Sequence, residues 1–215
     1  MKKLIPGLNI PINSIFCIGR NYADHAKEMG APLPDVPMVF LKPISSICYD
    51  GANIKLPKQS NDVHHEVELV IAIGKNGKNI SSEAAHEHIA GIGIGIDFTA
   101  RDLQALAKKK GHPWSVAKGF DQFAPISNFS PYAQQELNKQ QLTLTVNDET
   151  RQSASTSKMI FDVTTLISYL SSIFTLSEGD LIFTGTPEGV SAVNSGDILS
   201  ASLLPSDIFL TVSIV

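Results

Sequence analysis

The chain has 215 residues, of which 43% are hydrophobic and 18% are charged, enough apolar material for a large core and too little charge for a disordered protein. Its 17 Lys and Arg residues against 21 Asp and Glu residues give a net charge of −4, which argues against a nucleic-acid partner. We therefore expect a single globular domain over residues 1–215.

The N-terminal segment MKKLIPGLNIPINSIF begins with two lysines, but two prolines and two asparagines interrupt any apolar stretch of the kind found in a signal peptide. No run of about 18 apolar residues occurs anywhere, so we expect no membrane span and a cytoplasmic location. Cys17 and Cys48 belong to no CxxC or Cys/His cluster, which predicts two buried free thiols.

Short apolar or alternating runs, mostly bounded by Gly, Pro, Asn or Asp, recur along the chain and predict strands. In chain order they are SIFCIG, MVFLK, NIKLP, EVELVIAIG, IAGIGIGID, LTLTV, DLIFTG, DILSASL and IFLTVSIV. Between the first two, NYADHAKEM predicts a short helix that Gly30 would end, and the proline-rich residues 30–37 predict a loop. Because this loop begins beside a candidate base, we expect residues 29–37 to act as a lid over the site.

Two longer helices are predicted. Residues 100–110 have an apolar face, a possible N-cap at Thr99 and a glycine directly after them, and residues 162–174 carry an apolar stripe behind an N-cap at Asp162. Because these helices do not alternate regularly with the strands, the pattern predicts an α+β, β-rich fold and not a doubly wound one.

The segment HHEVEL places two carboxylates on one side of a strand, because alternate side chains of a strand point the same way. Glu66 and Glu68 would then lie together at the edge of a core, which is tolerated when a cation lies between them or one is protonated. A solvent-exposed strand face is the alternative interpretation.

The segment GIGIGID has glycines at alternate positions and ends in Asp97, so one face of this strand carries no side chains. Such a face admits a ligand or another backbone, and close strand packing is the alternative. The segment is not a dinucleotide fingerprint, because the position of the third required glycine holds Ile96.

Glu66, Glu68 and Asp97 together form an all-oxygen ligand set. Oxygen ligands suit Mg²⁺, Mn²⁺ or Ca²⁺, whereas zinc prefers His or Cys and the chain has no HExxH motif. The HEH segment at 86–88 lies in a polar turn, and we interpret it as solvated surface.

His25 and Glu28 lie three residues apart on one face of the predicted short helix, where the carboxylate can orient the imidazole as a general base for water. Lys118 in SVAKGF, or the glycine-rich turn TGTPEGV, could reach a substrate carboxylate or oxyanion. No GxSxG elbow, Walker A loop or cysteine nucleophile motif is present, which disfavours covalent catalysis and phosphoryl transfer.

Taken together, the sequence resembles the fumarylacetoacetate hydrolase superfamily, in its short single-domain acylpyruvase-like branch. The matching segments are GRNYADHAKEM, FLKP, HHEVEL, GIDFTARDLQ, KKKGHPWSVAKGFD, SKMIF and EGDLIFTGTPEGV, and in this order they cover nearly the whole chain.

The resemblance implies a mixed β-roll or sandwich fold, a homodimer, and Mg²⁺ or Mn²⁺ held by Glu66, Glu68 and Asp97. It implies a water-activating pair of His25 and Glu28 and an electrostatic role for Lys118. It also implies substrate contacts from Arg20, Lys42, Gln104 and Thr186.

The implied activity is hydrolysis of the C–C bond of a 2,4-dioxo acid such as acetylpyruvate or fumarylpyruvate, giving pyruvate and a carboxylic acid. His25, helped by Glu28, would deprotonate the attacking water, and Lys118 would stabilise the enolate charge that develops as the bond breaks. Decarboxylation or keto–enol exchange of oxaloacetate on the same site is the alternative, and a non-catalytic metal-binding β module is a more remote one.

Overall fold

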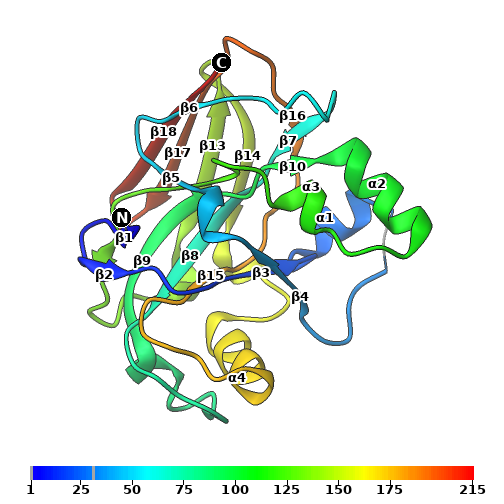
Figure 1. The fold of residues 1–215 in the computed structure, drawn as a ribbon. Helices are drawn as coiled ribbons and strands as arrows, with labels where there is room; N and C mark the ends of the chain where they lie inside the picture. The colour runs from blue at the N-terminus through cyan, green and yellow to red at the C-terminus, as the bar shows by residue number, and fades with distance from the viewer. Residues whose placement is uncertain (1, 31) are drawn as a thin grey trace.

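The structure is a computed structural model that describes residues 2–30 and 32–215, and its largest element is a mixed sheet that curves through the molecule (Figure 1). In spatial order its strands are β4 (Met38–Lys42), β3 (Ile15–Gly19), β15 (Leu181–Phe183), β8 (Val67–Ile73), β9 (Ile89–Ile96), β11 (Ala124–Ile126) and β5 (Ile47–Tyr49), and β12 (Ser130–Pro131) also pairs with β9.

A second large sheet packs against the first. Its strands, in spatial order, are β14 (Glu149–Ser155), β13 (Gln141–Val146), β17 (Ile198–Leu204), β18 (Ile208–Ile214) and β6 (Asn53–Ile54). Two small sheets complete the strand pairing, one of β10 (Thr99–Ala100), β7 (Val63–His65) and β16 (Ser191–Ala192) and one of β1 (Leu4–Ile5) and β2 (Ile10–Pro11).

The α-helices α1 (Ala23–Glu28), α2 (Arg101–Lys110) and α3 (Ser115–Lys118) gather on one side of the large sheet, and α4 (Val163–Ile173) lies away from them (Figure 1). The short 3₁₀ helices are η1 (Ile44–Ser46), η2 (Ala85–His88), η3 (Leu137–Lys139) and η4 (Thr156–Lys158). The predicted β-rich α+β fold is confirmed. No helix within the described residues is long and apolar enough to cross a membrane.

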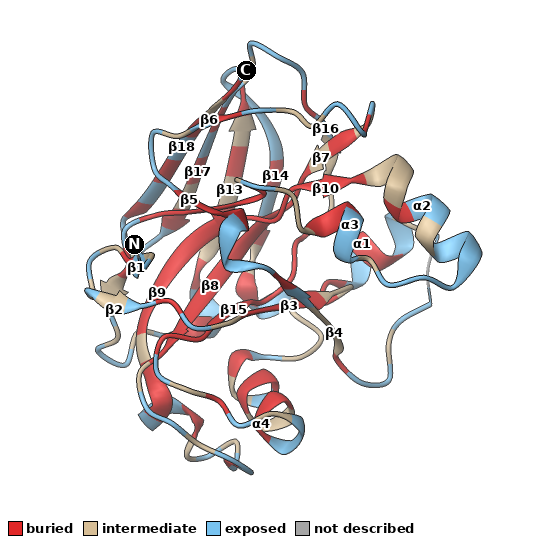
Figure 2. Ribbon diagram, viewed as in Figure 1, coloured by how far each residue is buried: buried red, intermediate tan, exposed pale blue. Residues whose placement is uncertain are grey.

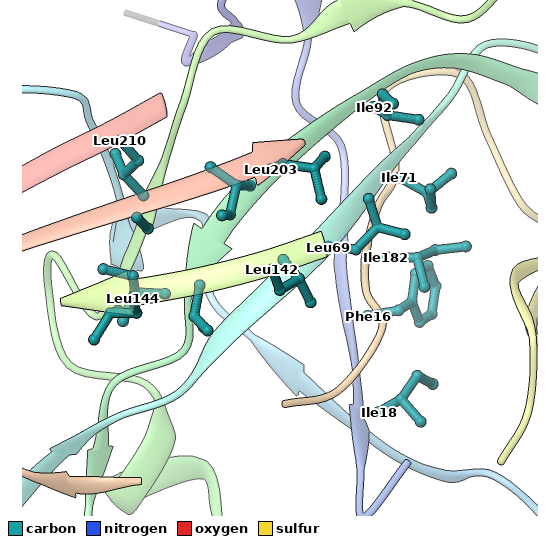
Figure 3. Close-up of a cluster of buried hydrophobic side chains, with 14 of the residues drawn as sticks. Phe16, Ile18, Leu69, Ile71, Ile92, Leu142, Leu144, Ile182, Leu203 and Leu210 are labelled. Carbon is teal, nitrogen blue, oxygen red and sulfur yellow. The ribbon is translucent and has the colours of Figure 1, made fainter. Parts of the chain in front are cut away.

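The main core lies where the two large sheets face each other, and the central strands are buried along their length (Figure 2). Figure 3 shows Leu69 and Ile71 of the first sheet in the same cluster as Leu142 and Leu203 of the second. Strand β8 is buried at every position, which explains why its sequence becomes wholly apolar after Glu68. Both cysteines are free and buried, as predicted.

The glycine face of β9 is filled by aromatic side chains and not by a ligand. A Cβ atom at Gly93 would lie 2.7 Å from the ring of Phe129, and one at Gly95 would lie 2.6 Å from the ring of Phe183. Of the two interpretations of GIGIGID, close packing is therefore the one that the structure supports.

Several local expectations differ from the structure. Thr99 belongs to β10, and α2 begins after Ala100 without a side-chain cap from that residue, because pairing of Thr99 with His64 extends the strand. Strand β14 has no counterpart among the predicted runs, since its polar sequence shows little apolar alternation. His88 of the HEH segment is buried and its Nδ1 contacts the carbonyl of Lys75, so this part is not a solvated surface.

Candidate active site

Strand pairing brings the three predicted carboxylates together. Glu66 lies in the break between β7 and β8, so it is not part of one continuous strand with Glu68, and Asp97 follows the last residue of β9. The register pairs Val67 with Ile96, and the Asp97 amide donates to the Glu66 carbonyl at 2.8 Å. One oxygen atom from each of the three buried carboxylates lies within 4.8 Å of the other two.

Three cationic side chains contact this triad. Lys118 Nζ lies 2.9 Å from Glu66 Oε2 and 2.5 Å from Asp97 Oδ2, and the Arg101 guanidinium lies 2.6 Å from Glu66 Oε1. Lys42 Nζ lies 2.6 Å from Asp97 Oδ1. Three anions are thus opposed by three cations, and this balance makes burial of the cluster tolerable.

The two glutamates have opposite electrostatic environments. Burial raises the pKa of Glu66, but the Lys118 ammonium and the Arg101 guanidinium outweigh burial and hold this pKa well below its usual range. Burial also raises the pKa of Glu68, and the neighbouring carboxylates Asp97 and Glu66 raise it further, against one hydrogen bond from the Gly185 amide. Glu68 therefore lacks a cation of its own.

The triad fits a divalent cation. The Lys42 ammonium donates to the carbonyls of Phe98, Lys118 and Phe123, so its contact with Asp97 Oδ1 is ionic and not a hydrogen bond. Among the described residues Asp97 Oδ1 has no hydrogen-bond donor although it is buried. Three buried carboxylates, one of them Glu68 with no ion-pair partner, are the oxygen ligands that a hard cation prefers.

The short helix α1 positions His25 and Glu28. His25 Nδ1 lies 3.3 Å from Glu28 Oε2, and the Gly189 amide donates to both oxygens of that carboxylate. The backbone of the TGTPEGV turn therefore holds the carboxylate that contacts the imidazole. The Asn21 side chain fastens the start of the helix, since its amide donates to the carbonyls of Phe161 and Thr184.

A small cavity of about 30 Å³ opens beside the triad. The sequence-predicted residues that line it are Arg20, His25, Glu66, Glu68, Gln104, Lys118 and Thr186. Glu28 and Asp97 adjoin it through their contacts with His25 and Lys118. Lys42 has a different place, because its buried Nζ is surrounded by Asp97 and three carbonyls.

Lys118 is held charged in the wall of this cavity. Burial lowers the pKa of Lys118, but the carboxylates of Asp97 and Glu66 reverse this effect and raise it above its ordinary value. The ring of Phe40 covers the ammonium, with the ring centroid 4.8 Å from Nζ. This group can stabilise negative charge and cannot serve as a base near neutral pH.

The sequence analysis did not single out Arg101, Lys108 or Trp114, which also line the cavity. Arg101 stands three residues before Gln104 and donates to its amide oxygen at 2.9 Å. Both side chains face the cavity from the start of α2. The i,i+3 spacing from Gln104 and the position four residues after Asp97 are the signals by which Arg101 could have been found.

Residues 14–210 match the family model described as fumarylacetoacetate (FAA) hydrolase C-terminal. This chain belongs to the fumarylacetoacetate hydrolase family. The resemblance drawn from its motifs is thus confirmed, and the match covers the elements that build the site.

Two relatives and one solved structure illustrate the range of the family. The mitochondrial oxaloacetate decarboxylase of Dictyostelium discoideum is 46% identical over 195 residues, covering 90% of this chain and 89% of that protein. The mitochondrial oxaloacetate tautomerase FAHD1 of Arabidopsis thaliana is 48% identical over 190 residues, covering 88% and 85%. Fumarylpyruvate hydrolase from Pseudomonas aeruginosa, solved in complex with Mn²⁺ and pyruvate, superimposes with a TM-score of 0.92 and is 39% identical, covering 96% and 91%.

These names all describe enzymes, so membership of the family supports an enzymatic activity for this chain. The three names give different reactions, because one protein is a decarboxylase, one a tautomerase and one a hydrolase.

Proposed function

We propose that this protein is a divalent-metal-dependent enzyme of small 2-oxo acids and that keto–enol tautomerisation of oxaloacetate is its principal reaction. The observation that carries the proposal is the buried Glu66, Glu68 and Asp97 cluster with the charged Lys118 at the wall of one cavity. Two relatives named for oxaloacetate, one a decarboxylase and one a tautomerase, are 46 and 48% identical, against 39% for the hydrolase structure, and this supports oxaloacetate as the substrate.

Mg²⁺ or Mn²⁺, held by the triad, would supply Lewis-acid stabilisation of negative charge on the substrate. Tautomerisation moves one proton from C3 to the C2 oxygen, while the C–H electrons form the C2–C3 double bond and the carbonyl electrons pass to oxygen. His25, oriented by Glu28, carries this proton, and Lys118 stabilises the charge on the oxygen.

The cavity wall also carries positive charge, because Arg20, Arg101 and Lys108 line it. The pKa of Lys108 is lowered by burial and then by the Arg101 and Arg20 charges, and the Glu66 carboxylate, which is paired with Arg101, opposes this only in part. A substrate with two carboxylates would relieve this repulsion, which favours oxaloacetate or fumarylpyruvate over a monocarboxylate.

Hydrolysis of an acylpyruvate is the second candidate, and the His25–Glu28 contact favours it. A proton carrier beside a carboxylate is also the arrangement that activates a water molecule for attack on a carbonyl carbon. The likeness to fumarylpyruvate hydrolase adds to this candidate.

The test compares the reactions on one protein preparation, with Mg²⁺ and with Mn²⁺. Loss of enol absorbance from oxaloacetate measures tautomerisation, pyruvate release measures decarboxylation, and cleavage of acetylpyruvate and fumarylpyruvate in ¹⁸O-water measures hydrolysis by label in the released acid. We expect rapid tautomerisation that chelation of the metal removes. If neither metal accelerates tautomerisation of oxaloacetate, tautomerisation is rejected as the principal reaction. If an acylpyruvate is then cleaved rapidly and the released acid carries the label, hydrolysis takes its place.

Two variants test the assigned roles. His25→Ala should lower tautomerisation and hydrolysis by about 100-fold or more. Decarboxylation should fall much less, because it removes no proton from C3 and the pyruvate enolate left when the C3–C4 bond breaks can take its C3 proton from water. Lys108→Met should raise KM for oxaloacetate and leave KM for acetylpyruvate nearly unchanged, because only the first substrate has a second carboxylate. Equal losses for all reactions, or equal KM values, would contradict these roles.

A further inference from the structure

Strand β8 extends beyond the end of its neighbour β15, and side chains supply hydrogen bonds to its backbone there. β15 pairs with β8 from Ala72 to Val70. Beyond that point the amide and Oγ1 of Thr184 both donate to the carbonyl of Leu69, at 3.1 and 2.9 Å, and Thr186 Oγ1 donates to the carbonyl of Val67 at 2.8 Å. The backbone between the two glutamates therefore depends on side chains for its hydrogen bonds.

The amide of Val67 has the same dependence. It donates to Oε1 of Gln152 at 3.0 Å, and this buried glutamine comes from β14 of the other large sheet. Because Thr186 binds the Val67 carbonyl and Gln152 binds the Val67 amide, both polar groups of this one residue are held from outside its own sheet. Val67 is the residue between Glu66 and Glu68.

Every polar atom of the Gln152 amide is used. Nε2 donates to Thr186 Oγ1 at 2.8 Å and to the carbonyl of Pro187 at 2.9 Å. Since Oε1 must then accept, His65 Nδ1, 3.0 Å away, carries the proton of that contact, and His65 Nε2 accepts from Ser191. Gln152 thus links His65 and Val67, the residues before and after Glu66, to Thr186 and Pro187 of the TGTPEGV turn.

We infer that Gln152 is a positioning residue that holds the Glu66–Val67–Glu68 backbone in the geometry that binds the metal. It touches neither the cavity nor the carboxylates, and it acts through the amide of Val67 and the hydroxyl of Thr186. The inference rests on the proposed metal site, and the break between β7 and β8 explains why the segment needs such support: regular strand pairing does not fix Glu66 there.

The test uses Gln152→Met, which keeps the length of the side chain and removes all its hydrogen bonds. Gln140→Met is the matched control, because Gln140 is another buried glutamine, bonded to Glu136 and Ser206, with no link to the glutamate segment. Thr186→Val removes only the hydroxyl bonded to the Val67 carbonyl and serves if Gln152→Met does not fold. The readouts are Mn²⁺ affinity by calorimetry and hydrogen exchange of the Val67 amide in the metal-free protein.

Gln152→Met should weaken Mn²⁺ binding by about 10- to 100-fold, as loss of a partner behind a ligand does, and should speed Val67 exchange. Gln140→Met should change neither readout, and Thr186→Val should weaken Mn²⁺ binding in the same direction. Unchanged Mn²⁺ affinity in folded Gln152→Met, or an equal loss in Gln140→Met, would overturn the inference. If the wild-type protein binds no Mn²⁺, the proposed metal site fails, whereas unchanged Val67 exchange in Gln152→Met rejects the glutamine contact itself.

Discussion

Glu66 and Glu68 are separated by one residue and have the same side chain, but their electrostatic surroundings differ. Glu66 is paired with Lys118 and Arg101, whereas Glu68 has a single hydrogen bond from the Gly185 amide and two neighbouring carboxylates. Without a metal, ionised Glu68 therefore destabilises the folded chain, and ionised Glu66 stabilises it.

Exchange of each glutamate for glutamine should consequently have opposite effects on stability. In metal-free protein Glu68→Gln should raise the free energy of unfolding at neutral pH, because it removes an uncompensated buried charge. Glu66→Gln should lower it by about 3 to 5 kcal/mol, because Lys118 and Arg101 lose their partner. Chemical denaturation of both variants measures these effects, and both should abolish tight Mn²⁺ binding. A loss of stability in Glu68→Gln would contradict the assigned environment.

The pH dependence of stability follows from the same shift. The folded-state pKa of Glu68 is raised above its ordinary value of 4.5, so its contribution is fully present below that pH and is lost as pH rises toward the folded pKa. Metal-free wild-type protein should lose stability over this interval, and Glu68→Gln should lose less. Thermal unfolding in chelator across this range compares them, and identical slopes would refute the prediction.

The backbone amide of Gly185 donates a hydrogen bond to the carboxylate of Glu68, and the conformation there requires glycine. Its φ is +99°, and a Cβ atom there would lie 2.7 Å from Cβ of Asn21, so a side chain requires the turn to move away from Glu68. Gly185→Ala should therefore weaken Mn²⁺ binding as well as stability. Gly196→Ala is the control, because its φ is similar and a Cβ there meets no atom within 4 Å. Equal Mn²⁺ affinity in the two variants would reject the role of Gly185.

At the scale of elements, the loop between α1 and β4 is the segment best placed to respond to substrate. Met29 before it lines the cavity, and Met38 after it packs against Gly19 at the cavity wall. Leu33 and Val36 are 59% and 58% exposed, so apolar surface stands beside the site. Ala31 lies outside the described residues, and the lid function of residues 29–37 stays a prediction.

Hydrogen exchange tests the lid. Because prolines have no amide proton, Leu33, Asp35 and Val36 report on this loop. Their exchange should slow when Mn²⁺ and oxalate, a non-reactive diacid, are added together, and amides of β18 should not change. Equal exchange of the three loop amides with and without oxalate would count against a lid.

At the scale of the whole molecule, the site ties distant parts of the chain into one structure. The triad comes from β8 and from the residues directly before β8 and after β9, its cationic partners come from α2, α3 and β4, and the TGTPEGV turn connects them to α1. A cation that binds only the assembled triad must therefore stabilise the whole fold.

Added Mn²⁺ at about 100 times its Kd should stabilise the protein by about 2.7 kcal/mol, which corresponds to a rise in Tm of about 5 to 10 °C. Thermal unfolding with Mn²⁺ and then with excess chelator measures the rise and its reversal. Glu68→Gln is the control, since without its third carboxylate the site should give little rise. An equal rise in that variant would locate the binding of Mn²⁺ elsewhere.

Much of the fold could be predicted from the sequence, because strands and helices depend on local patterns of apolar and polar residues. Alternation and apolar runs predicted the strands of the main core, and the Asp162 cap of α4 is present, its carboxylate accepting from the Thr165 amide at 2.8 Å. The motif order predicted the family, and the chemistry of three carboxylates predicted a hard-cation site, because ligand type is a property of residue identity.

Tertiary structure alone decided which side chains surround those carboxylates. The sequence predicted that both Lys42 and Lys118 act at the site, but folding puts Lys118 in the wall of the cavity and encloses Lys42 among Asp97 and three carbonyls. It also brings Arg101 onto Glu66 and Gln152 onto Val67, from residues 35 and 85 positions away. Charge and hydrogen-bond partners depend on distance in space, which strand pairing and sheet packing set and which no short window of sequence contains.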